Sequence, residues 1–239
     1  MKRLHQYSQY FIRNPRLVAN LIAKSSVTNT DVVYDIGAGS GVISSQLAPV
    51  AKKVIAVEFE PNTVETLRKN MSMYDNVDVI EADALTLPLP EEPYKVFANI
   101  PFHLSSKIVR RFAHERPPVD VYLIVQKQFA NKLLPEHDGF SSQLGMQVGV
   151  LFEIEIIKKL RRTDYWPHPN VDTVLLHFHY REKPLVPQLE YERYCRFIEK
   201  TFTNPDFFKS AYVRKFGTVP KSTASGLQLH DWVQFFSTN

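Results

Sequence analysis

"VVYDIGAGSGVIS", residues Val32 to Ser44, is the stretch that decides the fold. A β-branched run leads into a turn with glycines at positions 37, 39 and 41, and a helical pattern follows. Glycine lets the backbone turn tightly and lets a ligand approach it closely. Taken alone, the stretch is equally consistent with a strand-to-helix turn that binds nothing. Its meaning depends on what the neighbouring segments contribute.

Short β-branched runs alternate with helical patterns through the first three-quarters of the chain. Such alternation implies βαβ crossovers and predicts an α/β fold with a mostly parallel, seven-stranded sheet. Two prolines leave little room for a helix before the last run, so the last two strands are expected to pair antiparallel at one edge. The predicted strands are residues 31–36, 53–59, 77–80, 94–100, 120–126, 152–157 and 173–180, and the predicted helices are 41–50, 61–71 and 104–114.

A polar break containing two prolines, "REKPLVPQ" (181–188), reads as a linker. Helical stretches at 191–202 and 230–236 follow it, without strand alternation. We therefore expect a domain over residues 1–180 that contains the sheet and a small α-helical domain over residues 181–239.

Composition narrows the class of protein. The net charge is +4 and the sequence pI about 9.0. Basic residues occur in pairs at positions 52–53, 110–111, 158–159 and 161–162. Any one pair reads most simply as solvated surface, but together they favour a polyanionic partner such as nucleic acid. No apolar run reaches the ~18 residues of a membrane span, and the basic N-terminus has no apolar core typical of a signal peptide. The single cysteine, Cys195, cannot form an internal disulfide, which fits the reducing cytoplasm.

Acidic residues follow the predicted strands. Glu58 ends the second strand, where a carboxylate can accept hydrogen bonds from ribose hydroxyls, and Asp83 follows the third, where it can accept from an adenine amino group. Asp35 could receive an ammonium group or orient the glycine turn. Val42 stands where a dinucleotide fingerprint has its third glycine, so the set favours S-adenosylmethionine over NAD. Each acid alone is about equally consistent with a helix cap or turn.

"NIPF", Asn99 to Phe102, follows the fourth strand at the same edge of the sheet. The Asn99 side-chain oxygen and a neighbouring carbonyl can accept the hydrogens of an exocyclic amine. Pro101 fixes the backbone, and the Phe102 ring offers a face for a base to stack upon. Two acceptors would localise the amine lone pair toward an incoming methyl sulfonium. The alternative is a strand-ending turn with Phe102 in the core.

"DYWPHPNVDT" (164–173) holds Tyr165 and Trp166 in a proline-rich loop before the last strand. One of these aromatics could cover the second face of an extruded base, or both could pack down in an edge loop. His177 and His179 share one strand face, but no cysteine or acid is expected to complete a ligand set near them. We therefore predict no metal site.

The chain resembles the rRNA adenine N6-methyltransferases over about residues 6–180. "YSQYFI" (7–12), "DIGAGSG", "AVEFE", "EADAL", "NIPFHLSS" and "WPHPNVDT" occur in the order of that family's motifs. The compact length most resembles the erythromycin-resistance (Erm-type) enzymes of 23S rRNA. Tyr10 stands where the family has Asn, and Phe102 where it has Tyr.

This resemblance implies a Rossmann-like methyltransferase that uses S-adenosylmethionine to methylate adenine N6 in 23S rRNA and confers macrolide-lincosamide-streptogramin resistance. It implies a cytoplasmic monomer without membrane or metal. A small-subunit rRNA dimethyltransferase and a catalytically inactive RNA-binding protein of the same fold stay open as alternatives. Asn99, Phe102 and Tyr165 would act on the target adenine, with Phe102 and Tyr165 bracketing the base. The implied cofactor-binding residues are Tyr10, Ile12, Gly37, Gly39, Glu58, Asp83 and Asn99.

Overall fold

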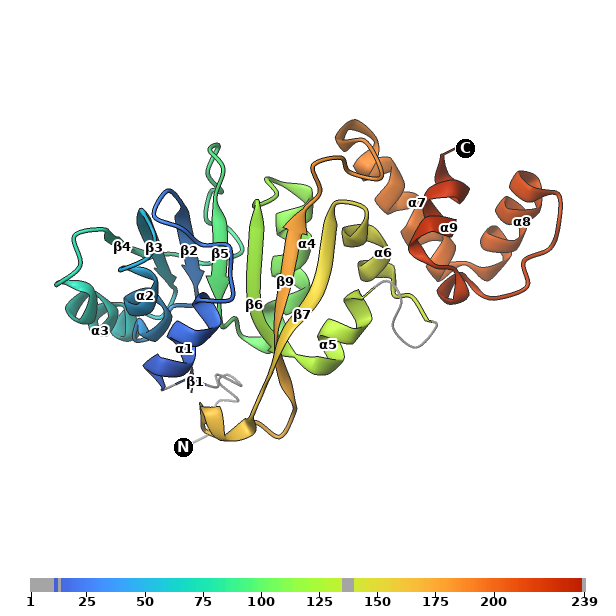
Figure 1. The fold of residues 1–239 in the computed structure, drawn as a ribbon. Coiled ribbons are helices and arrows are strands. Elements are labelled where there is room, and N and C mark those ends of the chain that lie inside the picture. Colours follow the sequence, from blue (N-terminus) through green and yellow to red (C-terminus); the bar gives the residue numbers. More distant parts are fainter. Residues whose placement is uncertain (1–10, 13, 135–139, 238–239) are drawn as a thin grey trace. The chain divides into compact units, whose positions relative to one another are not determined.

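The computed structural model describes residues 11–12, 14–134 and 140–237 (Figure 1). Within them, seven strands form one sheet in the order β4-β3-β2-β5-β6-β9-β7. All seven predicted strands are present, so the predicted sheet is confirmed. The strands are β2 (Val32–Ile36), β3 (Lys53–Glu58), β4 (Val77–Glu81), β5 (Lys95–Ala98), β6 (Asp120–Gln126), β7 (Phe152–Leu160) and β9 (Thr173–Tyr180).

Strand direction sets where the site lies. β2 pairs in parallel with both β3 and β5, and the pairs β3–β4 and β5–β6 are parallel too. The arrow of β9 runs opposite to that of β5 in Figure 1, and β9 and β7 are neighbours at one edge, as expected. The sheet is thus mixed but mostly parallel, and the carboxyl ends of β2 to β5 meet at one edge, where open α/β folds bind ligands.

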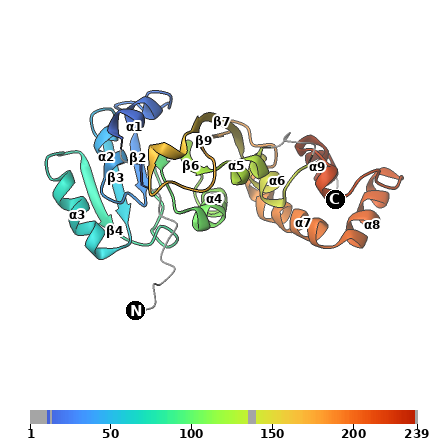
Figure 2. The ribbon, with the colours of Figure 1, turned by 90° about the horizontal axis from the view of Figure 1, so that it is seen from below.

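Helices cover both faces of this sheet. One face carries α1 (Pro15–Ile22) and α2 (Val42–Leu47), whose apolar side chains share a core cluster with side chains of β2 and β5. The other face carries α4 (Ser105–His114), which lies across the sheet from α1 in Figure 2. Met71 of α3 (Pro61–Met71) packs with Ala56 of β3.

Some elements escaped prediction. α1 begins at Asn14, whose side chain accepts from the backbone N–H groups of Arg16 and Leu17. A short strand β1 (Phe11–Ile12) pairs antiparallel with β8 (Tyr165–Trp166). Among the residues described, no helix is both long and apolar enough to cross a bilayer.

Contacts between Cα atoms divide the chain into two compact units. Residues 1–127 and 156–178 form the first, and residues 128–155 and 179–239 the second. Aromatic rings form the core of the second unit: Phe197 lies 4.9 Å from Phe235 between ring centroids, and Trp232 and Phe235 are fully buried. The predicted boundary at residue 180 stays a prediction. The remaining helices are α5 (Lys127–Leu133), α6 (Gln143–Gly149), α7 (Tyr191–Thr203), α8 (Pro205–Phe216) and α9 (Leu229–Phe236).

Candidate active site

The glycine turn between β2 and α2 needs its glycines. Gly37, Gly39 and Gly41 have φ angles of 72°, 58° and 90°, a region that other residues rarely adopt. A Cβ built on Gly41 would lie 2.7 Å from the Met71 methyl carbon, so α3 also closes off this position. The Gly37 N–H donates to the Val57 carbonyl at 2.8 Å, which ties the turn to β3.

Glu58, at the end of β3, is held by the backbone. Its carboxylate accepts from the N–H groups of Gly39 at 2.9 Å, Phe59 at 2.8 Å and Glu60 at 3.1 Å, and the residue is 6% exposed. A carboxylate offers about four acceptor positions, so these three bonds leave one, on Oε2. Glu58 can therefore accept a hydrogen bond from only one ribose hydroxyl while it keeps its bond to the glycine turn, not from both ribose hydroxyls.

Asp35 lies under the turn and is fully buried. The Ser44 hydroxyl donates to its Oδ2 at 2.6 Å. Burial, with a smaller contribution from the charge of Glu58, raises the pKa of Asp35 to about 7. Of the two roles considered for this residue, the structure favours orienting the turn over receiving an ammonium group, because no face of the carboxyl reaches solvent.

Asp83 begins a tight turn after β4. Its Oδ1 accepts from the Leu85 N–H at 2.8 Å, and its carbonyl accepts from the N–H groups of Thr86 and Leu87 at 3.0 and 2.9 Å. The residue is half-buried at the same sheet edge as the glycine turn. An adenine amino group would therefore be bound through Oδ2.

The Asn99–Phe102 segment lies beside the glycine turn. A Cβ built on Gly37 would lie 3.6 Å from Pro101 Cδ, so the two loops lie side by side with little room between them for a side chain at position 37. Ile100 is 1% exposed and anchors the segment, whereas Asn99 and Phe102 are half-buried. Phe102 then starts a 3₁₀ turn (Phe102–Leu104) that leads into α4. The predicted acceptor segment and the predicted cofactor turn thus share one rim of the sheet.

The aromatic loop, residues 164–173, buries one of its two rings and exposes the other. Tyr165 is 2% exposed, and its hydroxyl shares a 2.7 Å hydrogen bond with Thr173 Oγ1; burial raises its pKa well above the usual range. Trp166 is 54% exposed and, with Tyr165, lines a cavity of about 540 Å³. Ile12 is buried in the core opposite Tyr165, and position 10 lies outside the described residues. In this state the accessible aromatic of the loop is Trp166.

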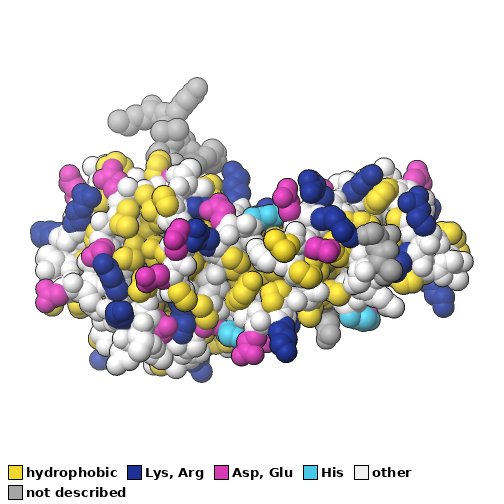
Figure 3. Space-filling model, turned by 90° about the horizontal axis from the view of Figure 1, so that it is seen from above, with side chains coloured by type: hydrophobic (Ala, Val, Ile, Leu, Met, Phe, Trp, Pro, Cys, Tyr) yellow, Lys and Arg dark blue, Asp and Glu magenta, His cyan; other side chains and the backbone are white. Residues whose placement is uncertain are grey.

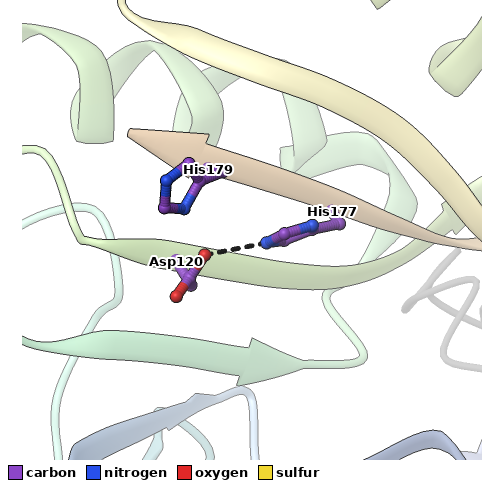
Figure 4. Close-up of side chains that lie close together, drawn as sticks. All are labelled: Asp120, His177 and His179. Carbon is purple, nitrogen blue, oxygen red and sulfur yellow. Dashed lines mark hydrogen bonds and ion pairs between the residues drawn. The ribbon is translucent and has the colours of Figure 1, made fainter. Parts of the chain in front are cut away.

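Asp120 and His177 lie close together, from β6 and β9 (Figure 4). His177 Nε2 is 2.8 Å from Asp120 Oδ1. The other oxygen, Oδ2, accepts from Ser26 Oγ at 2.5 Å and lies 3.7 Å from the Lys95 ammonium. The expectation that no acid lies near the histidines at 177 and 179 is therefore wrong. Asp120 shares the buried Lys95 with Asp31, whose carboxylate lies closer at 3.0 Å. Ligand atoms of Asp120, His177 and His179 all lie within 4.8 Å of one another, so the absence of a metal site stays a prediction.

Several members of the basic pairs have acidic partners. The distance between the charged groups is 2.7 Å for Lys53 and Asp78, and 3.0 Å for Arg162 and Asp172. On the face drawn in Figure 3, Lys and Arg side chains are interspersed with Asp and Glu. Charge on this face therefore adds little to the case for an RNA partner.

Comparison with known proteins decides the family. The family model described as Ribosomal RNA adenine dimethylase matches residues 2–206. The chain belongs to this family. An rRNA adenine N-6-methyltransferase of Streptococcus sanguinis is 30% identical over 201 residues, 84% of this chain and 80% of that protein. The crystal structure of the 23S rRNA methyltransferase ErmE matches with a TM-score of 0.79 at 26% identity, covering 95% of this chain and 98% of that one.

A second group of relatives has another target. Ribosomal RNA small subunit methyltransferase A of Clostridioides difficile is 28% identical over 186 residues, 73% of this chain and 64% of that protein. The family membership confirms the predicted enzyme class, rRNA adenine N6-methyltransferase, and its S-adenosylmethionine chemistry. The fold, a mostly parallel methyltransferase sheet with C-terminal helices, is confirmed as well.

Sequence reasoning missed two residues that hold the site. Ser44 bonds the buried Asp35, and Arg111 of α4 bonds the turn that begins at Asp83. Arg111 was read as part of a surface pair with Arg110. Its position, seven residues after Leu104 and three after Ile108, put it on the apolar face of the helix and was the available signal.

Proposed function

We propose that this chain methylates N6 of an adenine in 23S rRNA, and that this modification confers resistance to macrolides, lincosamides and streptogramins. The observation that carries the proposal is that the glycine turn lies directly beside Pro101, which a Cβ built on Gly37 would approach to 3.6 Å. This proximity brings the predicted methyl donor and the predicted amine acceptors to the same rim of the sheet.

The residues of the turn fit S-adenosylmethionine. Glu58 retains one acceptor position beside the turn, and Gly37 presents no side chain to a ligand lying against Pro101. In this proposal Gly37 and Gly39 contact the ligand through the backbone, Glu58 binds its ribose, and Asp83 binds its adenine. The bound cofactor supplies an electrophilic methyl group.

Asn99 prepares the acceptor. The lone pair of the adenine amine is delocalised into the ring, so the nitrogen is a poor nucleophile. Hydrogen bonds from its two hydrogens to the Asn99 side-chain oxygen and the Ile100 carbonyl would localise the pair and stabilise the positive charge that develops on nitrogen. With the cofactor bound, the N6–C bond would form as the C–S bond breaks and its electron pair goes to sulfur, and one N6 proton would leave to solvent.

Phe102 and the aromatic loop would hold the base. A half-buried Phe102 ring next to Asn99 offers one face for stacking. Tyr165 can supply the second face only after its contact with Thr173 opens, whereas Trp166 is already exposed. We propose that the enzyme acts as a monomer, as the resemblance to the family implies.

The relatives support the choice of large-subunit rRNA. The Streptococcus sanguinis protein has higher identity and covers more of this chain than the small-subunit enzyme does. A small-subunit target is the second candidate, and the 28% identity to the Clostridioides difficile enzyme supports it.

Tritium transfer distinguishes these candidates. Purified chain is incubated with S-[methyl-³H]adenosylmethionine and either protein-free 23S rRNA or small-subunit particles, with Asn99→Ala as the control. Label in N6-methylated adenine of 23S rRNA supports the proposal. Label confined to the small subunit favours the second candidate. Cofactor binding with no label in either RNA rejects both.

Resistance is tested in cells. Expression should raise the inhibitory concentrations of a macrolide and a lincosamide together, and primer extension on their 23S rRNA should stop at the modified adenine. Unchanged inhibitory concentrations despite a methylated site would overturn the resistance part alone.

A further inference from the structure

Arg111 of α4 binds the turn that follows β4. Its side chain is 9% exposed. One terminal nitrogen donates to the Ala84 carbonyl and the other to the Leu87 carbonyl, while Nε donates to Glu115 Oε1 at 2.9 Å. The guanidinium therefore directs both ends of its planar fork at the backbone of one short loop.

That loop contains the residue assigned to adenine. The Asp83 carbonyl accepts from Thr86 and Leu87, and its Oδ1 accepts from Leu85. The turn is thus closed internally around Asp83. Arg111 ties this turn to α4 from outside, since it bonds the carbonyl of Ala84 within the turn and that of Leu87 at its end.

The same helix also continues from the acceptor segment. α4 begins at Ser105, directly after the 3₁₀ turn that Phe102 starts. Arg111 lies within two turns of that beginning. A rigid helix therefore joins the segment assigned to the target adenine to the loop assigned to the cofactor adenine.

We propose that Arg111 is a positioning residue for cofactor recognition: it holds the Asp83 turn so that the enzyme discriminates an adenine ring from a purine that lacks the amino group. This inference rests on the proposed cofactor site. A purely structural role, in which Arg111 only stabilises the packing of α4, is the competing explanation.

The two explanations differ in what the variant loses. If Arg111 only supports packing, its removal weakens the binding of every cofactor analogue equally. If it positions Asp83, removal weakens the adenosyl compound and leaves the inosyl compound, which has a carbonyl in place of the amino group, nearly unchanged.

The experiment measures two dissociation constants by calorimetry, for S-adenosylhomocysteine and S-inosylhomocysteine. The variants are Arg111→Met, which removes the charge and the donors, and Arg111→Lys, which keeps the charge. The lysine ammonium cannot reproduce the planar fork of the guanidinium. Arg116→Gln is the matched control: Arg116 pairs with Glu91 of the same loop at 2.9 Å, but it is 47% exposed. Denaturant unfolding confirms that each variant is folded.

We expect wild type and Arg116→Gln to prefer the adenosyl compound by the same ratio. Arg111→Met should reduce that ratio by about tenfold or more, the effect of losing charge-assisted hydrogen bonds, with Arg111→Lys between the two. The KM for S-adenosylmethionine should rise while kcat at saturation stays within about twofold. If Arg111→Met unfolds, the Arg111→Lys ratio decides.

An unchanged ratio in a folded variant, with or without an equal loss of affinity for both compounds, would overturn the inference. Failure of wild type to bind either compound would instead reject the proposed cofactor site, so the two failures are distinguishable.

Discussion

Replacing Asp35 with asparagine should change how stability depends on pH. The carboxyl is fully buried, and burial raises its pKa from 3.8 to about 7. Because one pKa unit corresponds to about 1.4 kcal/mol, holding the ionised form of Asp35 in the folded state costs about 4 kcal/mol.

The sign follows from proton binding. Between pH 3.8 and 7 the folded protein keeps a proton on Asp35 that the unfolded chain releases. Folding therefore takes up a proton in this window, and the free energy of unfolding falls as pH rises through it. Between pH 5 and pH 8 this one group should lower the free energy of unfolding by about 3 kcal/mol.

Asp35→Asn removes the ionisation and keeps an oxygen that can accept from Ser44. The free energy of unfolding of each protein is measured by urea titration at pH 5, 6, 7 and 8 at constant ionic strength. The difference between variant and wild type should shift in favour of the variant by about 3 kcal/mol from pH 5 to pH 8. Asp78→Asn, which removes a half-exposed carboxylate from β4, controls for the lost charge.

A difference that stays constant from pH 5 to pH 8 would refute the reasoning, because Asp35 would then be ionised in the folded state throughout. Weakened cofactor binding that follows the same titration, with unfolding unaffected, would restore the ammonium-binding role that burial argues against.

Substitutions at three further positions test the site. Gly41→Ala places a methyl 2.7 Å from Met71 Cε at a φ of 90°, so it should cost about 1–3 kcal/mol in urea unfolding; wild-type stability would contradict the packing. Glu58→Gln turns an amide toward backbone N–H groups that need an acceptor and should raise the calorimetric Kd of S-adenosylhomocysteine about tenfold or more; an unchanged Kd would argue against a ribose role. Phe102→Leu should lower kcat/KM for rRNA about tenfold while Phe102→Tyr retains it, and equal activity of the two would remove the stacking role.

Periodicity predicted the sheet well, because each strand is a β-branched run between turn signals. α6 was missed for a physical reason: its Gly145 and Gly149 weaken the helical pattern, yet a Cβ at Gly145 would lie 2.7 Å from the Lys132 carbonyl. α1 could have been predicted, since Asn14 followed by Pro15 is a strong start signal.

The site was predictable to the level of which loops meet. Residues at the carboxyl ends of parallel strands must share an edge, and Gly37 and Pro101 do so. The sequence could not predict which hydrogen-bond partner each polar atom of the site has. The Glu58 carboxylate accepts hydrogen bonds from three backbone N–H groups, and the Tyr165 hydroxyl is hydrogen-bonded to Thr173. Both arrangements depend on other segments of the chain folding against these residues.

Asn99→Ala tests the central claim most directly. N6-methylated adenine in 23S rRNA is quantified by mass spectrometry for wild type and variant, and the Kd of S-adenosylhomocysteine is measured on the same preparations. The account predicts a loss of transfer of at least about a hundredfold with cofactor affinity within about tenfold. Transfer at the wild-type rate would contradict it.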